Sequence, residues 1–390
     1  MISFLRQIWA VSAMNLAALP SRAGASLVTV VGVATVVAVM LSLLGIGAGV
    51  MGSVLQNDQP DQAVVLSTGA TELMGSFSQS DVAQIAQAPG LARAPDGKPI
   101  VDARALVLVE LENMVGGGTN NTVFRGVGPM AALMNPPGWH IAEGRRFTPG
   151  LHELIAGRRA QALYKHLEVG DTVMLRGTPW KVVGAYADAG GVDENGIVTD
   201  ADTLLAAFNR TTYQSVGVKL DSATSFGRFK DAITSNPQLQ VQVKRVGDYY
   251  RDQLKALTAL LSFVGYFVGG VMAVGVVFGA LNTMYSAVDA RKREIATLRA
   301  LGFGATAVVA SVILESLVLA IPGALLGSLV AWVLFNNHDI HMGGVSFPLS
   351  VTPGLVVLGL IWALVIGLIG GLAPSIRAAR VPVAEALRAT

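Results

Sequence analysis

Four long apolar stretches constrain the fold of this chain more than any other feature. No charged residue occurs between Arg22 and Asp58, between Lys255 and Asp289, or between Asp339 and Arg377, and Glu315 is the single charge between Ala300 and His338. A helix of about 20 apolar residues, rising roughly 1.5 Å per residue, crosses about 30 Å of hydrocarbon. The sequence therefore predicts an integral membrane protein with four spanning helices.

The composition agrees with this class. Charged residues make up 14% of the chain and the mean hydropathy is +0.54, whereas about 25% of a soluble domain is charged. A cleaved signal peptide explains the first stretch less well, because the stretch is longer than a signal core and no clear cleavage site follows it. We predict a membrane protein with four transmembrane α-helices and a large α+β periplasmic domain between the first two.

The apolar stretches divide the chain into nine segments. They are an N-terminal cytoplasmic interfacial helix at 1–26, spans at 27–50, 256–285, 308–334 and 353–373, a periplasmic domain of two expected subdomains at 51–255, a cytoplasmic coupling segment at 286–307, an outer loop at 335–352 and a cytoplasmic tail at 374–390. In the first segment Phe4, Leu5, Ile8 and Trp9 share one helical face, which suits either the membrane interface or packing on the spans.

The orientation follows from the basic residues near the span ends, because lysine and arginine are retained on the cytoplasmic side. One side of the membrane would hold Arg6, Arg22, Arg291, Lys292, Arg293, Arg299, Arg377, Arg380 and Arg388. The loop at 335–352 has no lysine or arginine. We expect both termini in the cytoplasm and the large domain outside it, with a helix after Asp248 running into the second span without a break.

The large domain alternates short strand-like and helix-like patterns, which is typical of an α+β fold. The expected strands are 63–67, 100–111, 153–156, 172–175, 180–185, 215–220 and 239–246. The expected helices are 80–87, with Ser80 as the N-cap, 158–166 and 225–235. The segments 115–121 and 188–195 are rich in Gly, Asn and Asp and are expected to be loops or subdomain junctions.

Residues for catalysis or metal binding are not evident. Gly97-Lys98 is followed by Pro99 and not by Ser or Thr, so the sequence contains no phosphate-binding loop. His140, His152 and His166 are scattered, and His338 with His341 could hold a metal only loosely. We expect no catalytic residue, metal or cofactor on this chain. The sequence has no cysteine, which fits a periplasmic domain without disulfides.

The spans contain small residues one turn apart and one acid. The G-x-x-x-G pairs are Gly265/Gly269, Gly275/Gly279, Gly323/Gly327 and Gly367/Gly371. We interpret them as helix-packing surfaces, one of which could serve a dimer. Glu315 lies about two turns inside the third span, where a carboxylate is costly. It belongs to a proton or substrate path or, as we favour, pairs with a neighbouring helix or the basic cytoplasmic end.

The charged stretch 289–304, DARKREIATLRALGFG, lies between two of the spans. As a helix it sets Glu294 three residues after Arg291 and aligns Ile295, Leu298 and Leu301, and Gly302 is a natural stop. The sequence predicts a short amphipathic helix on the cytoplasmic face whose apolar stripe needs a partner. A charged loop that only holds the topology is the alternative.

Arg293 to Gly302 resembles the R-E-I-x-x-L-R-A-L-G signature of the MacB/FtsX-like permeases of ABC transporters. The sequence L-E-S-L at 314–317 and the tail at 373–388 are also similar to that family, the tail having one extra residue before Glu385. In the large domain, the segments 143–147, 155–172 and 180–184 resemble the MacB-type periplasmic core. The resemblance covers essentially the whole chain.

This resemblance implies a non-catalytic membrane subunit in the inner membrane of a bacterium. Its expected partners are two copies of an ABC ATPase on a separate chain, which would carry the ATP and Mg, a second permease copy, a periplasmic adaptor, an outer-membrane channel and the lipid bilayer, with no nucleic acid. The segment 291–301 would dock in a groove of the ATPase. Ile295 and Leu298 would fill the groove, and Arg293, Glu294 and Arg299 would make polar contacts.

The full set of residues expected to serve coupling is Arg291, Arg293, Glu294, Ile295, Leu298, Arg299, Leu301 and Gly302, with Arg377, Arg380, Glu385 and Arg388 in the cytoplasmic tail. ATP-driven closure of the ATPase would move the periplasmic domains mechanically. The substrate stays open. Efflux or export, extraction of lipoproteins or lipids, and regulation of a periplasmic enzyme are the three functions considered.

Overall fold

The computed structural model describes residues 9, 11, 12, 14, 23–55, 58–188, 191–336, 339–342 and 345–380. The chain forms two compact units. A helical unit comprises Met1–Gly49, Leu257–His338 and Leu349–Thr390, and an α+β unit comprises Val50–Ala256 and Asp339–Pro348. Most of the predicted N-terminal helix, and Glu385 and Arg388 of the predicted tail, lie outside the described residues.

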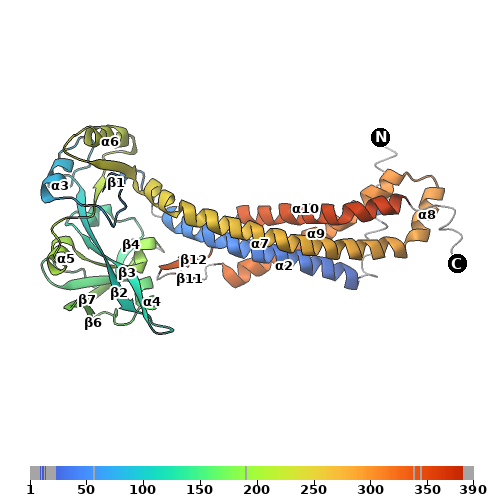
Figure 1. The fold of residues 1–390 in the computed structure, drawn as a ribbon, viewed down its shortest axis with the longest axis horizontal. Coiled ribbons are helices and arrows are strands. Elements are labelled where there is room, and N and C mark those ends of the chain that lie inside the picture. Colours follow the sequence, from blue (N-terminus) through green and yellow to red (C-terminus); the bar gives the residue numbers. More distant parts are fainter. Residues whose placement is uncertain are drawn as a thin grey trace. The chain divides into compact units, whose positions relative to one another are not determined.

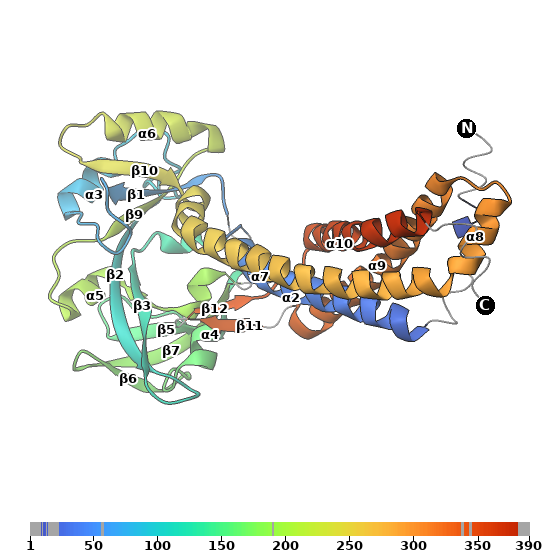
Figure 2. The ribbon, with the colours of Figure 1, turned by 45° about the vertical axis from the view of Figure 1, so that its right-hand side comes forward.

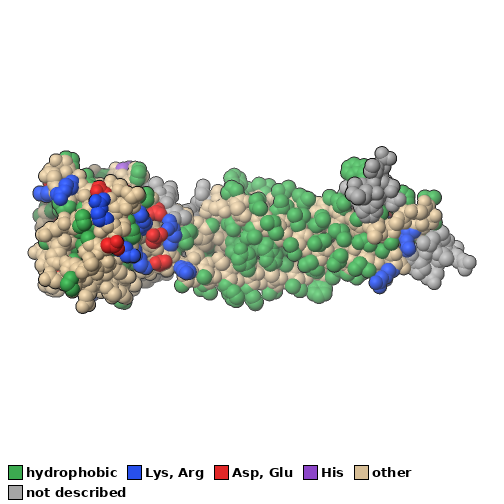
Figure 3. All heavy atoms as spheres, turned by 90° about the horizontal axis from the view of Figure 1, so that it is seen from above, with side chains coloured by type: hydrophobic (Ala, Val, Ile, Leu, Met, Phe, Trp, Pro, Cys, Tyr) green, Lys and Arg blue, Asp and Glu red, His purple; other side chains and the backbone are tan. Residues whose placement is uncertain are grey.

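Four helices of the structure are long and apolar enough to cross a membrane. They are α2 (Ala23–Leu55), α7 (Val246–Ala290), α9 (Ala305–Phe335) and α10 (Pro353–Ala379), drawn in Figure 1. Hydrophobic side chains cover the visible surface of the helical unit in Figure 3, and Lys and Arg side chains appear near its end. The predicted fold class of four apolar helices with an α+β domain between the first and second is confirmed.

Glycines set how closely these helices pack. A Cβ at Gly327 of α9 would lie 2.3 Å from the carbonyl oxygen of Ala34 in α2, and one at Gly323 would lie 2.9 Å from that of Val30. Gly367 and Gly371 of α10 meet α9 in the same way, and Gly265 and Gly269 of α7 meet Leu44 and Met40 of α2. Three of the four glycine pairs therefore pack helices within the chain, as predicted.

The fourth pair is different. A Cβ at Gly275 or Gly279 of α7 would meet no described atom within 4 Å. Exposed apolar side chains continue along this helix at helical spacing: Phe263, Phe267, Val271, Val274 and Phe278. We call these five residues the α7 ridge. This part of α7 is the least covered of the four spans, since 17% of its apolar window is buried, against 44% for α2.

The α+β unit is built on one sheet of ten strands (Figure 2). The strands are β1 (Gln62–Ser67), β2 (Val101–Glu112), β3 (Thr119–Val127), β4 (Trp139–Gly144), β5 (Glu153–Gly157), β6 (Thr172–Leu175), β7 (Thr178–Asp188), β8 (Ile197–Asp200), β9 (Ser215–Lys219) and β10 (Val241–Arg245). Their order is β10-β1-β9-β2-β3-β8-β5-β7-β4, with β6 paired to β7.

The long strand β2 joins the two halves of this sheet. Its residues 101–104 pair with β9 and its residues 105–112 pair with β3. Short helices accompany the halves: α3 (Gln79–Ile85), α4 (Arg158–Leu163), α5 (Ala201–Ala207) and α6 (Phe226–Thr234), with 3-10 turns η2 (Ala131–Met134), η3 (Val192–Asn195) and η4 (Ala223–Ser225). One hydrophobic cluster, which includes Phe77, Phe124, Trp180 and Phe229, extends through both halves.

The seven strands expected from the sequence all form, and three other strands of the ten-stranded sheet are not predicted. The missed strands are β3, β4 and β8, and helix α5 was also missed. The predicted loop 115–121 is only partly a loop, because β3 begins at Thr119 after a turn in which Gly116, Gly117 and Gly118 all have positive φ. The N-cap of α3 is Ser78 and not Ser80, because the Ser78 side chain accepts a hydrogen bond from the Asp81 amide.

The segment expected to be a loop at 335–352 contains a two-stranded hairpin, formed by β11 (Asp339–Met342) and β12 (Val345–Pro348). His341 lies in β11 and His338 lies outside the described residues. The helix expected after Asp248 is continuous through α7, as predicted. Helix α10 begins at a side-chain cap, where the Thr352 hydroxyl accepts a hydrogen bond from the Leu355 amide.

Candidate functional site

The candidate site is the short helix α8 (Lys292–Ala300), which joins the end of α7 to the start of α9. In Figures 1 and 2 it lies across the direction of α7, at the end of the helical unit where α10 also ends. Gly302 has φ +95, its amide donates to the Arg299 carbonyl, and the Phe303 amide donates to the Leu298 carbonyl. This pair of bonds is the Schellman helix stop, so the prediction that Gly302 ends the helix is confirmed.

A buried ion pair connects α8 with α9. The Arg291 guanidinium at the N-cap of α8 lies 3.3 Å from the Glu315 carboxylate, and each side chain is only 6% exposed. This contact agrees with the favoured interpretation of Glu315, which paired it with the basic end of the helices. It also changes the interpretation of Arg291, because a guanidinium directed at Glu315 is not presented to a partner protein.

The apolar side of α8 is used inside the chain. Ile295, 7% exposed, packs with Val288 of α7, Val308 and Val312 of α9, and Ala378 of α10. Ala296 is also buried. The expectation that Ile295 fills a groove of an ATPase is therefore corrected. Its partners are the ends of three spans, and α8 is held on all of them.

Polar contacts connect the same helices. Arg299 donates a hydrogen bond to the Ala379 carbonyl at the end of α10, at 2.9 Å. Lys292 lies 2.8 Å from Asp289 of α7. Arg377 of α10 lies 3.9 Å from the same carboxylate, and its guanidinium is 5.3 Å from the centre of the Tyr285 ring. Arg377 of the predicted tail thus belongs to this junction, while Arg380 is an exposed residue at the C-terminal end of α10.

The outward side of α8 presents a different set of residues. Arg293, Glu294 and Thr297 are exposed, and Leu301 at the C-cap is 73% exposed. Leu298 is half-buried, so Ile295, Leu298 and Leu301 do not form the single apolar stripe that the sequence predicted. We call Arg293, Glu294, Thr297 and Leu301 the outer face of α8.

The sequence contained a signal for the inward role of Arg291. Glu315 is the single charge within the third apolar stretch, and a buried carboxylate needs a cation or several hydrogen-bond donors. The cationic residues nearest to it along the chain belong to the segment before α9. Sequence alone could not choose among Arg291, Lys292, Arg293 and Arg299, because the choice depends on the turn between α7 and α8.

The motif at 143–147 is structural in the α+β unit. Gly144 has φ +72 and ends β4, and the next residue, Arg145, forms a two-pronged ion pair with Glu153 at the start of β5, at 2.5 and 2.7 Å. The hydrogen bonds from Arg145 lower the pKa of Glu153 to about 2. Among the described residues, no three His, Asp or Glu side chains are grouped in a way that could hold a metal ion.

Comparison with protein families gives two matches along the chain. Residues 26–236 match the MacB-like periplasmic core domain, and residues 266–383 match the C-terminal part of FtsX-like permeases. The first match alone covers more than half of the chain. The second includes the end of α7, all of α8, and the helices α9 and α10.

Curated relatives are distant in sequence. An uncharacterized ABC transporter permease of Methanocaldococcus jannaschii is 25% identical over 57% of this chain and 58% of its own length. The uncharacterized ABC transporter permease YknZ of Bacillus subtilis is 25% identical over 65% of this chain and 67% of its own length. The macrolide export ATP-binding/permease protein MacB of Bdellovibrio bacteriovorus is 23% identical over 96% and 60%. The chain therefore spans about three fifths to two thirds of these proteins.

Two solved structures align with about half of this chain. The extracellular domain of YknZ aligns with 47% of this chain and 99% of its own, at a TM-score of 0.35 and 16% identity. The periplasmic region of MacB from Actinobacillus actinomycetemcomitans aligns with 52% and 95%, at a TM-score of 0.38 and 13% identity.

Proposed function

Because the chain belongs to the family of ABC transporter permeases with MacB-like periplasmic core and FtsX-like domains, we propose that it transmits the work of a partner ATPase to a large domain across the membrane. In this proposal the chain is a non-catalytic membrane subunit, and ATP and Mg bind to the partner. The conformational change drives export of a substrate from the periplasm or the inner membrane, with a periplasmic adaptor as a further partner.

The observation that carries the proposal is the packing of α8. A helix that an ATPase moves must be held firmly by the spans and must still present a surface to its partner. Helix α8 has both properties. Ile295 and the Arg291–Glu315 pair join it to the ends of α7, α9 and α10, and the outer face of α8 is exposed.

The buried ion pair suits force transmission for a physical reason. Separating a buried guanidinium from its carboxylate leaves both charges unpaired in a medium of low dielectric constant, at a cost of about 3–5 kcal/mol. A displacement of α8 is therefore expected to move the start of α9 with it. The hydrogen bond from Arg299 to Ala379 extends the same connection to α10.

The proposed orientation places α8 in the cytoplasm, where ATP is available, and the α+β unit on the other side. The lysines and arginines of the α7–α8 and α10 ends support this side as the cytoplasmic one. A bacterial inner-membrane location follows from the resemblance to MacB.

The outer face of α8 can be tested without knowing the substrate. Tagged full-length protein would be purified from native membranes, and the amount of co-purified ABC ATPase would be measured by mass spectrometry. Replacing Leu301 with Asp and Arg293 with Glu removes the exposed apolar contact and reverses one charge. We expect at least roughly a 10-fold loss of the ATPase, which corresponds to about 1.4 kcal/mol.

Thr306→Asp provides the matched control, because Thr306 is exposed in the first turn of α9, where an acid is tolerated. Replacing Arg299 would be less informative, because its bond to Ala379 also holds α8 in place. Recovery of the ATPase with Leu301→Asp/Arg293→Glu at the level of the control would reject the outer face as the docking surface.

A further inference from the structure

A pocket in the α+β unit has features of a ligand site that the coupling function does not use. It lies on the face of the sheet opposite the main core. Neighbouring residues along the strands separate the two faces, as alternation requires: Phe124, Leu154 and Ile197 belong to the main core, and Arg125, Ile155 and Val198 line the pocket. The cavity has a volume of about 130 Å³.

Three arginines reach this pocket, and two of them are neutralised by acids. Arg104 lies 2.8 Å from Asp102 and 3.5 Å from Glu72. Arg125 lies 2.7 Å from Asp193. Burial alone would lower the pKa of Arg104, but the carboxylates of Asp102 and Glu72 outweigh burial and raise it. These two guanidinium groups are committed to the protein.

The acids are committed as well. One oxygen of Asp102 accepts from Arg104 and the other accepts from the Gly128 amide at 2.7 Å. Asp193 pairs with Arg125. A third acid of the lining, Asp188, is 3% exposed. Asp102 and Asp188 are therefore buried, while the side chain of Asp193 is 41% exposed and its charge is balanced by Arg125.

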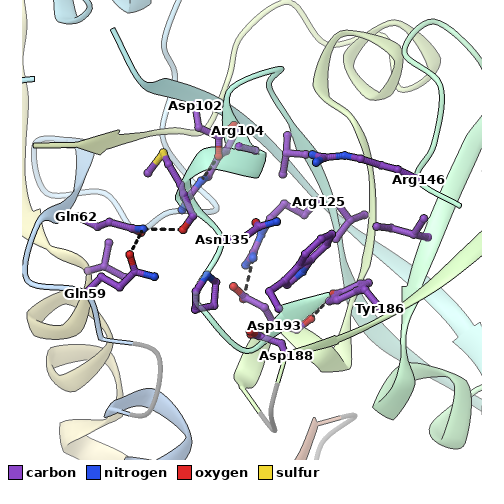
Figure 4. Close-up of a pocket in the computed structure, with 18 of the residues that line it drawn as sticks. Gln59, Gln62, Asp102, Arg104, Arg125, Asn135, Arg146, Tyr186, Asp188 and Asp193 are labelled. Atoms are coloured by element: carbon purple, nitrogen blue, oxygen red, sulfur yellow. Dashed lines mark hydrogen bonds and ion pairs between the residues drawn. The ribbon is translucent and has the colours of Figure 1, made fainter. Parts of the chain in front are cut away.

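Arg146 differs from the other two arginines. Arg146 follows the end of β4, and in Figure 4 its side chain extends into the pocket. Its guanidinium lies 6.0 Å from the centre of the Trp139 ring and 5.4 Å from that of Phe147. Within the part of the chain that the structure describes, its guanidinium forms no ion pair or hydrogen bond, and the carboxylate of Asp102 acts on it only at longer range. Arginine stays protonated in proteins and has five N–H donors.

The surroundings of Arg146 are aromatic and apolar. The rings of Trp139 and Tyr186 are stacked, with centres 5.7 Å apart. Phe147 and Ile155 pack in the same small cluster as Tyr186. A cation with unused donors beside a flat aromatic wall matches a ligand that combines one anionic group with one apolar ring or short chain.

The volume of the pocket limits the size of the ligand that it can hold. An engineered cavity of about 150 Å³ in another protein holds benzene, so 130 Å³ accommodates roughly one ring. We propose that this pocket binds small organic carboxylates with an apolar body about the size of benzoate. The carboxylate would accept hydrogen bonds from Arg146, and the apolar body would lie against Trp139 and Tyr186.

The proposal can be tested with three probes of one size. Full-length protein in lipid nanodiscs would be titrated with 4-fluorobenzoate, 4-fluorobenzamide and 4-fluorobenzylammonium, with binding followed by ¹⁹F relaxation. We expect the carboxylate to bind most tightly. Arg146→Gln should weaken carboxylate binding roughly 10-fold or more and leave amide binding nearly unchanged. Trp139→Leu should weaken both the carboxylate and the amide.

Arg158→Gln is the matched control, because Arg158 pairs with Glu143 and does not line the pocket. Thermal unfolding of each variant would verify that it is folded. No measurable binding of 4-fluorobenzoate at about 10 mM, equal binding of acid and amide, or an unchanged affinity in Arg146→Gln would each overturn the proposal. Since the titration needs no ATPase, its result is independent of the coupling function.

Discussion

At the scale of single residues, the pairing of Arg291 with Glu315 has the largest consequences. It places two charges in a segment where isolated charges are costly and joins two helices through one contact. Such a pair is not by itself a source of stability, because the desolvation of both ions offsets their attraction. Its value in this chain is that α8 and α9 cannot separate without exposing a buried charge.

Two variants distinguish a local structural pair from a connection that transmits force. Glu315→Ala leaves the Arg291 cation buried without its carboxylate, so we expect about 3–5 kcal/mol of destabilisation and a clearly lower unfolding temperature in detergent. Arg291→Met/Glu315→Leu removes both charges and should be more stable than Glu315→Ala. A double variant that unfolds earlier than Glu315→Ala would contradict this energetic account.

The double variant also separates stability from coupling. If the pair transmits motion, Arg291→Met/Glu315→Leu should fold and retain its ATPase while ATP hydrolysis no longer drives transport. Wild-type transport by this variant would show that the connection between α8 and α9 is made by Ile295 and its apolar neighbours.

At the scale of elements, the glycine pairs separate internal from external packing surfaces. Gly323 and Gly327 bring α9 close to the α2 backbone, whereas Gly275 and Gly279 lie on the uncovered part of α7 beside the α7 ridge. Small residues flanked by large apolar ones are typical of helix association in lipid. We therefore expect the α7 ridge to contact the second permease copy that the family resemblance implies.

The absence of native cysteine makes this expectation easy to check. Phe278→Cys on the ridge should form disulfide-linked dimers in native membranes on mild oxidation. Ala280→Cys is the control on the same helix, because Ala280 is buried against α10. Cross-linking confined to Ala280→Cys, or absent from both, would exclude the ridge as a contact between two copies.

The sequence predicts an element well when its residues follow a strong hydrophobic pattern. It predicts an element poorly when the element forms only because it pairs with other strands. The four spans are predicted by the length of the apolar stretches. The end of α8 at Gly302 is predicted because a helix commonly ends at a residue with positive φ, which glycine adopts easily. Strand β3, TNNTVFRGV, begins with four polar residues and contains Arg125 and Gly126, so it does not look like a strand, yet it pairs with both β2 and β8. Strand β8 has four residues and α5 has seven, which is too short for a clear period.

The candidate site shows the same limit. The existence of α8, its end at Gly302 and the need of Glu315 for a partner could be read from the residues. Which face of α8 points inward could not, because Arg291 and Ile295 are oriented by the turn after α7 and by packing on helices distant in sequence. Arg146 was part of a recognised motif, but its place beside Trp139 depends on how β4 and the residues after it fold.

At the scale of the whole molecule, we predict on which side of the membrane the α+β unit and helix α8 lie. Val115, at the tip of the β2–β3 turn, is 85% exposed, so a cysteine in its place should be accessible to a reagent. It should react with a membrane-impermeant maleimide in intact cells with a permeabilised outer membrane. Thr297→Cys, on α8, should react only after the inner membrane is opened. Val115 is preferable to Gly117, whose φ of +69 disfavours any side chain.

Labelling of Thr297→Cys before the inner membrane is opened would reverse the proposed orientation. It would also remove the proposed site of the ATPase, because ATP would not be available on that side. The outcome thus bears on the coupling proposal without requiring the partner to be identified.

The length of α7 has a mechanical consequence. Its 45 residues contain no proline, and at roughly 1.5 Å per residue they extend for about 68 Å, more than twice the thickness of the hydrocarbon layer. A helix of that length can act as a lever: a tilt of about 5° displaces one end by roughly 6 Å relative to the other. If α7 bends, the adjacent Gly269 and Gly270 are the weakest place for it to do so. The stiffness of the helix at these two residues would then set how much of the displacement at one end of α7 reaches the other end.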